Sequence, residues 1–165
     1  MTPTEIIQSK IFENALAFIP VLNRWKQDGS KMVFTNGCFD LIHRGHIDSL
    51  AKAATLGNRL IVGLNSDSSV KLLKGENRPL IDQQSRAVLL ASLLMVDAVV
   101  IFDEETPYEL IRNIQPDVLV KGTEYQIEEI AGSDIVLAKG GTVERIDLTE
   151  GFSTSELIVK IKEKF

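Results

Sequence analysis

Met32-Val33-Phe34-Thr35-Asn36-Gly37-Cys38-Phe39-Asp40-Leu41-Ile42-His43-Arg44-Gly45-His46 is the stretch that decides the fold. It begins as an apolar run typical of a buried strand, and the spacing of Ile47, Leu50, Ala51 and Ala54 then marks one face of a helix. Residues 36–46 therefore join a strand to the start of a helix. Backbone N–H groups at a helix start lack partners, so this position favours an anion.

The motif holds both histidines of the chain, His43 and His46, three residues apart. Residues with this spacing share a helix face, so both side chains can face one ligand. Asn36 and Gly37 allow a tight turn and a close approach of the backbone. The pattern predicts a phosphate-binding site. The alternative is a structural pair of histidines that form hydrogen bonds at a helix start.

Apolar runs typical of strands alternate with stretches of helical periodicity along the whole chain. The predicted strands are Met32–Thr35, Leu60–Leu64, Ala98–Phe102, Val118–Val120 and Thr142–Ile146. The predicted helices are Ile47–Leu56, Gln83–Leu94, Pro107–Ile114, Glu128–Ala138 and Ser153–Lys162. This alternation predicts an α/β fold, a Rossmann-like open sheet of about five parallel strands with helices on both faces.

Ligands of such sheets bind at the carboxyl ends of the strands, near the point where the strand order reverses. This rule places Asn65–Asp67 and Lys121–Gly122 at the same crevice as the histidines. Lys71 and Lys74 follow the second strand, and Lys74 is the stronger candidate for phosphate contact because a glycine follows it. A solvated lysine pair is the alternative. Arg86 either binds phosphate or pairs with Asp82 or Glu76.

Composition and charge limit the other classes of function. The chain has 165 residues, 44% of them apolar and 25% charged, which predicts one globular domain over residues 1–165. Its net charge of −5 argues against a broad nucleic-acid surface. Residues 1–30 are predicted to form a helical extension packed on the domain, helical from about residue 13 to 27, with a kink or break at Pro20.

Cys38 is the only cysteine, so no disulfide can form within the chain and a reducing compartment, the cytoplasm, is expected. No apolar run reaches the length of about 18 residues that a membrane span needs. Residues 1–30 also lack the order of basic and apolar residues that marks a signal peptide. A small buried cysteine is common behind a strand, so Cys38 is not interpreted as a nucleophile.

Residues 37–46 resemble the signature of the nucleotidyltransferase superfamily that carries a His-x-Gly-His motif preceded by Gly-x-Phe-Asp. Gly37, Phe39, Asp40, His43, Gly45 and His46 all match in register. The resemblance implies that the two histidines contact nucleotide phosphates and that Gly45 lets the helix start approach them. A zinc site would need more ligands than two histidines and one cysteine supply, so Mg²⁺ carried on the phosphates is favoured and no metal held by the protein is expected. Asp40 either orients the metal or the acceptor, or caps a turn.

Further stretches are similar to the family of adenylyltransferases that make ADP-heptose, and the similarity covers about residues 10–165. They are Asn65–Pro79, Val120–Gly122, Glu128–Ser133 and Gly151–Thr154. This resemblance implies that ATP and a sugar 1-phosphate, D-glycero-β-D-manno-heptose 1-phosphate, are the substrates, in lipopolysaccharide core or related glycan synthesis. It also implies a homodimer and a separate sugar kinase that makes the sugar 1-phosphate.

The main alternative is a cytidylyltransferase that acts on glycerol 3-phosphate or another polyol phosphate. That related family ends on Arg-Thr-Glu-Gly-Ile-Ser-Thr-Thr, whereas this chain has Leu148-Thr149-Glu150-Gly151-Phe152-Ser153-Thr154-Ser155, with leucine at the arginine position. Lys121-Gly122 is also the arrangement of the heptose type. An alternative of another class is a non-catalytic nucleotide-binding protein, against which the retained His43, His46 and Lys74 argue.

The resemblance and the rule on strand ends together assign each predicted site residue to a role. The predicted catalytic residues are His43, His46 and Lys74. The predicted nucleotide-binding residues are Asn36, Gly37, Cys38, Phe39, Gly45, Lys121, Gly122, Ser153 and Thr154. The predicted substrate-binding residues are Asp40, Asp67, Lys71 and Arg86. Ser153 and Thr154 stand at a helix start, where a hydroxyl can cap the helix and also hold a phosphate oxygen.

Overall fold

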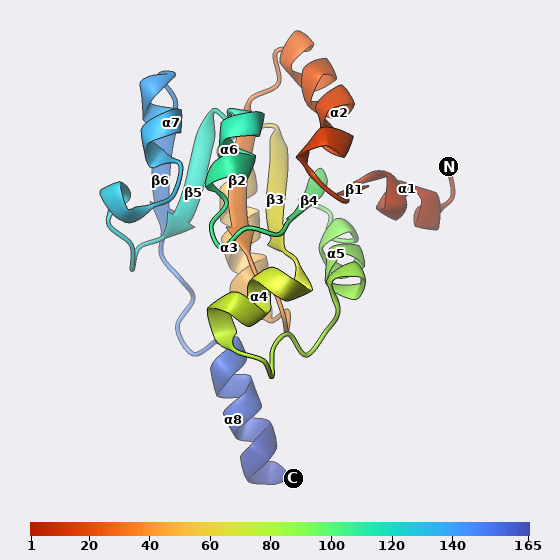
Figure 1. The fold of residues 1–165 in the computed structure, drawn as a ribbon, viewed down its shortest axis with the longest axis vertical. Coiled ribbons are helices and arrows are strands. Elements are labelled where there is room, and N and C mark those ends of the chain that lie inside the picture. The colour runs from red at the N-terminus through yellow and green to blue at the C-terminus, as the bar shows by residue number, and fades with distance from the viewer.

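Six parallel strands form one sheet at the centre of the molecule (Figure 1). The computed structural model describes all residues 1–165. The strand order is β1-β4-β3-β2-β5-β6. The bounds are Ile11–Phe12 for β1, Met32–Gly37 for β2, Arg59–Asn65 for β3, Ala98–Phe102 for β4, Val118–Gly122 for β5 and Thr142–Ile146 for β6. The predicted α/β fold is therefore confirmed.

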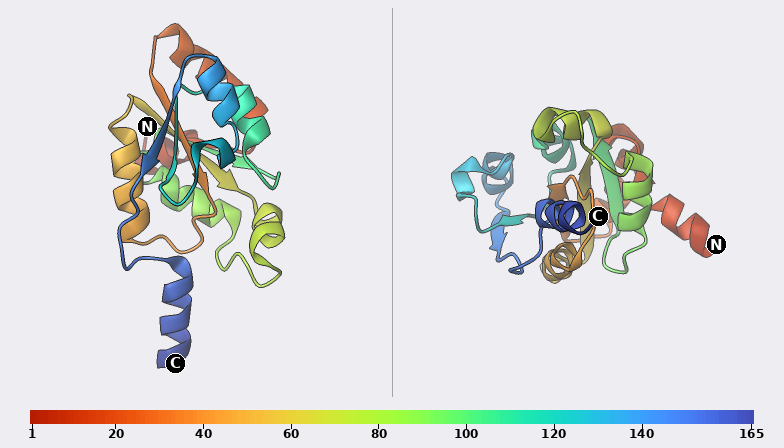
Figure 2. Two further views of the ribbon diagram at one scale, coloured as in Figure 1. Left: turned by 90° about the vertical axis from the view of Figure 1, so that its left-hand side faces the viewer. Right: turned by 90° about the horizontal axis from the view of Figure 1, so that it is seen from below.

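Helices cover both faces of this sheet, as the views in Figure 2 show. On one face lie α2 (Ala15–Gln27), α6 (Tyr108–Ile114) and α7 (Ser133–Ala138), and on the other α3 (Arg44–Ala54) and α5 (Gln83–Ala91). The remaining helices are α1 (Pro3–Ser9), α4 (Asp67–Lys74), the 3₁₀ helix η1 (Ile127–Glu129) and α8 (Thr154–Lys164). None of these helices combines the length and apolar character needed to cross a membrane.

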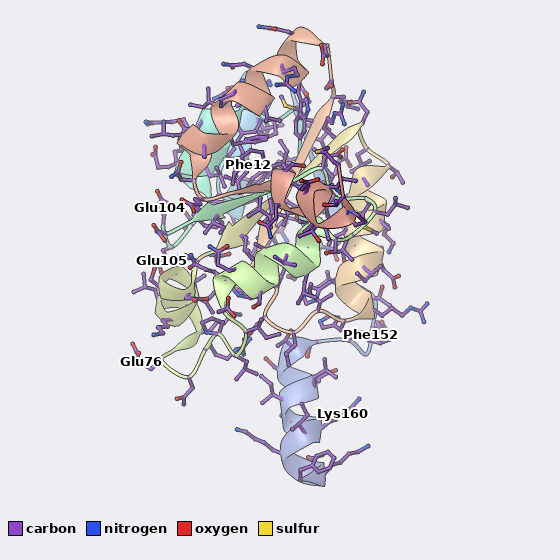
Figure 3. All side chains as sticks on the ribbon, turned by 90° about the vertical axis from the view of Figure 1, so that its right-hand side faces the viewer. Phe12, Glu76, Glu104, Glu105, Phe152 and Lys160 are labelled. Carbon is purple, nitrogen blue, oxygen red and sulfur yellow. The ribbon has the colours of Figure 1, made fainter.

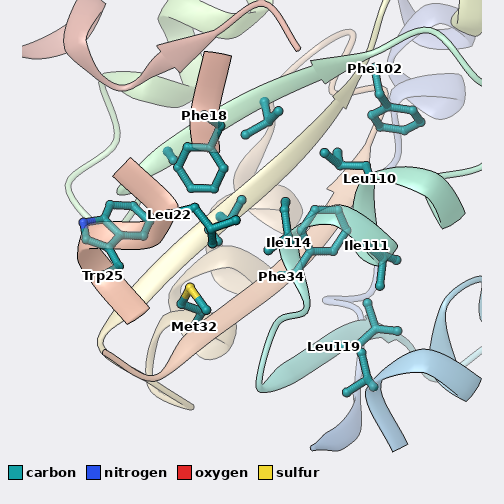
Figure 4. Close-up of a cluster of buried hydrophobic side chains, with 14 of the residues drawn as sticks. Phe18, Leu22, Trp25, Met32, Phe34, Phe102, Leu110, Ile111, Ile114 and Leu119 are labelled. Carbon is teal, nitrogen blue, oxygen red and sulfur yellow. The ribbon is translucent and has the colours of Figure 1, made fainter. Parts of the chain in front are cut away.

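Two apolar clusters, one on each face, hold the layers together. Neighbouring residues of β2 belong to different clusters, because Phe34 points to the α2 and α6 side and Val33 to the α3 and α5 side. Figure 4 shows Phe18 and Leu22 of α2 packed over the first cluster, and Phe18 and Phe34 are both fully buried. Burying one such side chain contributes about 1.5–3 kcal/mol. The β2 strand is thus fixed from both sides.

The N-terminal segment differs from its predicted form. Residues 11–12 add a sixth strand, β1, which pairs with β4 at the sheet edge, so the segment is part of the sheet rather than only a helical extension. A strand of two residues is too short to give a periodic pattern. Of the kink or break predicted at Pro20, the break does not occur, because α2 continues through it from Ala15 to Gln27.

Two other segments also differ from the prediction. The chain after β3 forms a helix that was not predicted, α4, whose first turn is capped by the Ser66 hydroxyl, which accepts a hydrogen bond from the N–H of Ser69. The helix predicted over residues 128–138 is interrupted. Ile130 is extended and Gly132 has φ +84°, so η1 and α7 are separate.

The order of the strands fixes where a ligand can bind. From the central β2 the chain proceeds through β3 and β4 on one side, and it then crosses to β5 and β6 on the other. The switch point therefore lies between β2 and β5. Their carboxyl ends, Gly37 and Gly122, open on the same edge of the sheet, which is where ligands of doubly wound sheets bind.

Candidate active site

A cleft of about 640 Å³ opens at this edge of the sheet. Most of the predicted site residues line it: Asn36, Gly37, Cys38, Phe39, Asp40, His43, Gly45, His46, Lys74, Lys121, Ser153 and Thr154. Gly122 lines an adjoining hollow of about 180 Å³, which also borders on Asn36, His46 and Lys121. Asp67, Lys71 and Arg86 do not line either space. The fold thus gathers predicted residues from four separate stretches of the chain.

The residues packed around the two histidines in the cleft lining, which we name the histidine wall, are Phe39, His43, Gly45, His46 and Phe152. The Nδ1 of His46 accepts a hydrogen bond from the backbone N–H of His43 at 3.3 Å, and the two rings stack with centroids 3.9 Å apart. Because Nδ1 is an acceptor, neutral His46 carries its proton on Nε2. Nε2 has no partner within the protein and is free to donate to a ligand.

The electrostatics of the histidine wall favour neutral imidazoles. Burial, together with the neighbouring His43, lowers the pKa of His46 from 6.5 to about 4. Burial also lowers the pKa of His43. At neutral pH, His46 is therefore a neutral hydrogen-bond donor at the N-terminus of α3, where the helix dipole adds positive potential.

Two features of the histidine wall are energetically unfavourable. The Nδ1 of His43 is the one buried side-chain nitrogen or oxygen of the chain without a hydrogen-bond partner, and a group left in this state costs about 1–3 kcal/mol. Phe39 has φ +47°, a left-handed conformation that is uncommon outside glycine. Its ring packs on His46 with centroids 5.1 Å apart. Such costs cluster at functional sites.

Gly45 connects the histidine motif to the distant stretch around Phe152. A Cβ at position 45 would lie 3.0 Å from the ring of His43 and 3.0 Å from the Cβ of Phe152. Figure 3 shows Phe152 beside the start of α8, next to α3. The glycine is therefore required by the packing of two side chains, a reason that the sequence motif alone did not reveal.

Lys121 and Asn36 join the two strands at the switch point. The Nζ of Lys121 donates to the Oδ1 of Asn36 at 3.2 Å and lies 5.2 Å from the ring centroid of Tyr125. Burial lowers the pKa of Lys121, and the nearby Glu124 acts in the opposite direction. Lys121, near the carboxyl end of β5, thus lies at the cleft, where the rule on strand ends predicted it.

Ser153 and Thr154 begin α8 at the rim of the cleft. The Ser153 hydroxyl oxygen accepts a hydrogen bond from the N–H of Glu156 at 3.0 Å, so it caps the helix, and its own proton remains available to a ligand. The Thr154 hydroxyl donates to the carbonyl of Leu41 at 3.2 Å. Thr154 therefore ties α8 to the motif, and Ser153 is the freer donor of the two.

Arg86 has a structural position rather than the predicted contact with substrate. Its side chain is fully buried, and all three nitrogens have partners: Nε with Ile81 O, Nη1 with Cys38 O and Asn65 O, and Nη2 with Asp67. Its carboxylate partner is Asp67, and not Asp82 or Glu76. The Oδ1 of Asp67 lies 2.8 Å from the Nη2 of Arg86, so this ion pair occupies both residues. Neither residue lines the cleft.

Asp40 is also more buried than its predicted role requires. Its side chain is 1% exposed, and its oxygens accept hydrogen bonds from Arg78 Nε at 2.7 Å and from the N–H groups of Leu80 and Ile81 at 2.9 Å. Burial raises the pKa of the Asp40 carboxyl, but these donors outweigh it and the pKa lies below its usual value. The carboxylate faces the protein, and it does not have an oxygen free for the metal or the acceptor.

The remaining predicted residues divide by position. Lys74 is exposed at the end of α4 and lines the cleft, whereas Lys71 lies one turn earlier and does not. Burial raises the pKa of the Cys38 thiol, although Lys74, Arg86 and Arg78 act to lower it. A protonated thiol is a poor nucleophile, which agrees with the interpretation of Cys38 as part of the lining.

Comparison with known proteins agrees with this geometry. Residues 34–160 match the family described as cytidylyltransferase-like. The chain belongs to this family. The matched range begins in β2 and reaches into α8, so it includes the whole cleft.

Relatives of this cytidylyltransferase-like chain include proteins named bifunctional protein HldE. The protein from Campylobacter jejuni serotype O:2 is 58% identical over 84% of this chain and 29% of its own length. The protein from Azorhizobium caulinodans is 51% identical over 86% of this chain and 30% of its own length. The chain thus spans about 30% of these curated relatives. A solved lipopolysaccharide core biosynthesis protein from Thermoplasma volcanium is 27% identical, with a TM-score of 0.60 over 73% of this chain and 98% of its own. The fold is shared with a pantoate-beta-alanine ligase from Francisella tularensis. The two are 15% identical, with a TM-score of 0.60 over 92% of this chain and 76% of that chain.

Some residues of the cytidylyltransferase-like cleft were not predicted. The lining also includes Glu105, Thr106 and Pro107 after β4, together with Glu124 and Glu129 after β5. Figure 3 shows Glu105 on the loop beyond the end of β4, above α4. The rule that ligands meet strand ends, applied to β4, would have found the first three. Arg78 also lines the cleft and was not among the predicted site residues.

No three His, Cys, Asp or Glu side chains are grouped in the structure so that they could hold a metal ion. Besides the acids Glu105, Glu124 and Glu129, the cleft presents two cations and a neutral donor, Lys74, Lys121 and His46, which suit the oxygens of a phosphate. This donor set fits Mg²⁺ that is carried into the cleft on nucleotide phosphates, because magnesium keeps several waters and is commonly bound through substrate phosphates.

Proposed function

We propose that this chain transfers the adenylyl group of ATP to D-glycero-β-D-manno-heptose 1-phosphate, giving ADP-heptose and pyrophosphate. The observation that carries the proposal is the neutral His46 at the start of α3, whose Nε2–H is free and fixed by its hydrogen bond to His43 N–H. The relatives named HldE, 51–58% identical, support the choice of a heptose phosphate. Lipopolysaccharide core or related glycan synthesis is the process that this product would serve.

The reaction needs alignment and charge stabilisation more than a strong base. A phosphate oxygen of the sugar 1-phosphate attacks the α-phosphorus of ATP in line. The new O–P bond forms as the bond from the α-phosphorus to the oxygen of the β-phosphate breaks, and pyrophosphate leaves. A phosphate monoester has its second pKa near 6, so it is already ionised at neutral pH. Catalysis then rests on positioning and electrostatics.

The residues of the cleft have distinct roles in this scheme. His43 and His46 donate to phosphate oxygens that gain charge in the transition state, and Lys74 and Lys121 neutralise the triphosphate. The Ser153 hydroxyl donates to a phosphate oxygen while it caps α8. Mg²⁺ would neutralise phosphate charge in addition, without direct ligands from the protein. No residue is required to form a covalent intermediate.

The alternative substrates are CTP and a polyol phosphate. The observation that bears on this choice is Leu148, which lines both the cleft and the adjoining hollow where the cytidylyltransferases that act on glycerol phosphate have arginine. An apolar side chain there cannot donate to a ribose or phosphate oxygen. We therefore favour ATP.

Pyrophosphate release tests the proposal directly. Purified protein with Mg²⁺ and heptose 1-phosphate should release pyrophosphate with ATP, and much more slowly with CTP. Release only with CTP and glycerol 3-phosphate would move the assignment to the alternative. Nucleotide binding without release across a panel of sugar and polyol phosphates would indicate a non-catalytic nucleotide-binding protein.

The proposal also includes a cytoplasmic homodimer and a sugar kinase that supplies the sugar 1-phosphate. Exposed apolar side chains on α8, Val159 and Ile161, offer a surface that a second copy can cover. Sedimentation equilibrium should give twice the mass of the chain. A mass of one chain at micromolar concentration would reject the dimer and leave the proposed reaction unaffected.

A further inference from the structure

Arg78 lies in the segment of residues 75–81 that joins α4 to α5, which we name the arginine loop. Its Nε donates to the Oδ2 of Asp40 at 2.7 Å. The N–H groups of Leu80 and Ile81, in the same loop, donate to Asp40 at 2.9 Å. One buried carboxylate therefore fixes three points of the loop against the histidine motif.

The remaining donors of Arg78 have no partner within the protein. A guanidinium carries five N–H donors, and Arg78 uses only the one on Nε. In contrast, every nitrogen of the nearby Arg86 is occupied. The Arg78 side chain is 17% exposed and lines the cleft, so its Nη groups border the space that a ligand would enter.

A second cation of the cleft, Lys74, lies near Arg78. Lys74 lines the same cleft at the end of α4, and the charges of Lys74 and Arg78 both act on the Cys38 thiol. The negative charge of Asp40 is distributed over three donors, so it does not occupy the Nη edge of Arg78. Two cations thus border the cleft next to the histidine motif, and one of them, Arg78, keeps its Nη donors unpaired.

We infer that Arg78 binds phosphate oxygens of the substrates through its Nη groups, and that Asp40 is a positioning residue that holds it there. The inference rests on the proposed function, because it assigns a further contact in the same cleft. A guanidinium is planar and matches phosphate in a bidentate geometry. Since Asp40 already fixes its orientation, little side-chain entropy remains to be lost on binding.

Two sources of phosphate are possible, the β- and γ-phosphates of the nucleotide and the phosphate of the acceptor. Binding of Mg²⁺-pyrophosphate and of inorganic phosphate to the full chain, measured by calorimetry, separates them. Arg78→Met should weaken one of the two about 10-fold to 100-fold, and Arg78→Lys should restore part of the loss. Arg112→Met is the matched control, because Arg112 is an exposed arginine of α6 outside the cleft.

Selective loss of pyrophosphate assigns Arg78 to the nucleotide, and selective loss of phosphate assigns it to the acceptor. Equal affinities of Arg78→Met and the wild type for both probes would overturn the inference, as would a wild type that binds neither. These measurements need no turnover. The two proposals can fail separately. If Arg78→Met binds pyrophosphate more weakly than the wild type, but the wild type releases no pyrophosphate from ATP and heptose 1-phosphate, the proposed function is rejected and the role of Arg78 is kept.

The role of Asp40 is tested by a double-mutant cycle on pyrophosphate or phosphate affinity. Asp40→Asn should weaken binding in the wild-type background and have little further effect in Arg78→Met, because its action passes through that arginine. The same loss in both backgrounds would mean that Asp40 supports only the fold. If Asp40→Asn does not fold, Arg78→Met and Arg78→Lys decide the inference, since they leave Asp40 with its two backbone donors.

Discussion

The two sides of the cleft are built in different ways. On the histidine wall, the hydrogen bond that sets the orientation of His46 joins residues only three apart in sequence. On the arginine side, Arg78 lines the cleft and Arg86 is buried without reaching it, and their hydrogen bonds join them to residues 38 and 48 positions away, Asp40 and Cys38. One side is formed by a local motif, and the other exists only after the chain has folded.

This difference separates the contributions of the two sides to chemistry and to stability. The histidine wall presents an unpartnered donor to the cleft, so we expect its loss to lower the rate with little effect on folding. Every nitrogen of the buried Arg86 already has a partner and the residue does not line the cleft, so we expect its loss to lower stability with little effect on the chemistry of the folded fraction. Substitutions on each side test this separation.

The largest expected effect comes from Arg86→Met. The substitution leaves the carbonyl oxygens of Cys38, Asn65 and Ile81 buried without their donor, so the free energy of unfolding should fall by about 3–5 kcal/mol. Urea denaturation followed by circular dichroism measures the change. Arg112→Met, which removes an exposed arginine, should change it by less than about 0.5 kcal/mol. If Arg86→Met is as stable as the wild type but binds ATP more weakly, the original prediction that Arg86 contacts the substrate would be correct.

The second effect is on the histidine wall. His46→Ala should lower kcat about 100-fold to 1000-fold, since it removes a preorganised donor. His46→Asn can still accept the His43 N–H but lacks the donor at the Nε2 position, so it should be as slow as His46→Ala. Single-turnover measurements of pyrophosphate release give the rate. Near-normal turnover of His46→Asn would show that the Nε2 proton is not used.

The histidine wall could be predicted from sequence, because a helix start, the spacing of His43 and His46 and the flanking glycines are local features. The alternation of apolar runs likewise predicted five of the six strands, since strands buried on both faces have a strong pattern. The strand β1 was missed because two residues carry no periodicity. The α4 helix was missed because its polar first turn resembles a loop.

The arginine side could not be predicted, because the partners of a buried charge depend on which segments the fold brings together. Arg86 has local acids such as Asp82, four residues away, and its actual partner is Asp67 across the site. Asp40 has the sequence context of a ligand, whereas its burial gives it a role in holding the arginine loop. The residue types of Arg86 and Asp40 made them candidates for the site, and only the structure shows that both make hydrogen bonds that hold the fold.

A smaller effect is expected where the local motif depends on a distant contact. In Gly45→Ala the new Cβ would lie 3.0 Å from both His43 and Phe152, so the free energy of unfolding should fall by about 1–3 kcal/mol and His43 should shift. Phe152→Ala retains a Cβ, which is the atom in contact, so it should rescue Gly45→Ala only in part. Thermal unfolding of the two variants and their combination measures the coupling. Unchanged stability of Gly45→Ala would show that the contact relaxes without cost.

The smallest expected effect is a pH dependence confined to acid. The pKa of His46 is about 4 in the folded chain and about 6.5 when unfolded. Between these values the unfolded chain binds a proton that the folded chain does not, so stability should fall as pH decreases from about 6.5 towards 4 and be unaffected by this group above 7.

Histidine-selective ¹⁵N NMR can follow the two imidazoles separately, because the chain has only two, and His43→Gln leaves one for assignment. At pH 5.5 the His46 ring should be neutral with its proton on Nε2, since its Nδ1 accepts the N–H of His43. A proton on Nδ1 would mean that the hydrogen bond from the His43 N–H does not form, and a His46 titration near 6.5 would mean that the ring is not buried as the structure has it. The local side of the cleft would then lack the fixed donor that distinguishes it from the arginine side.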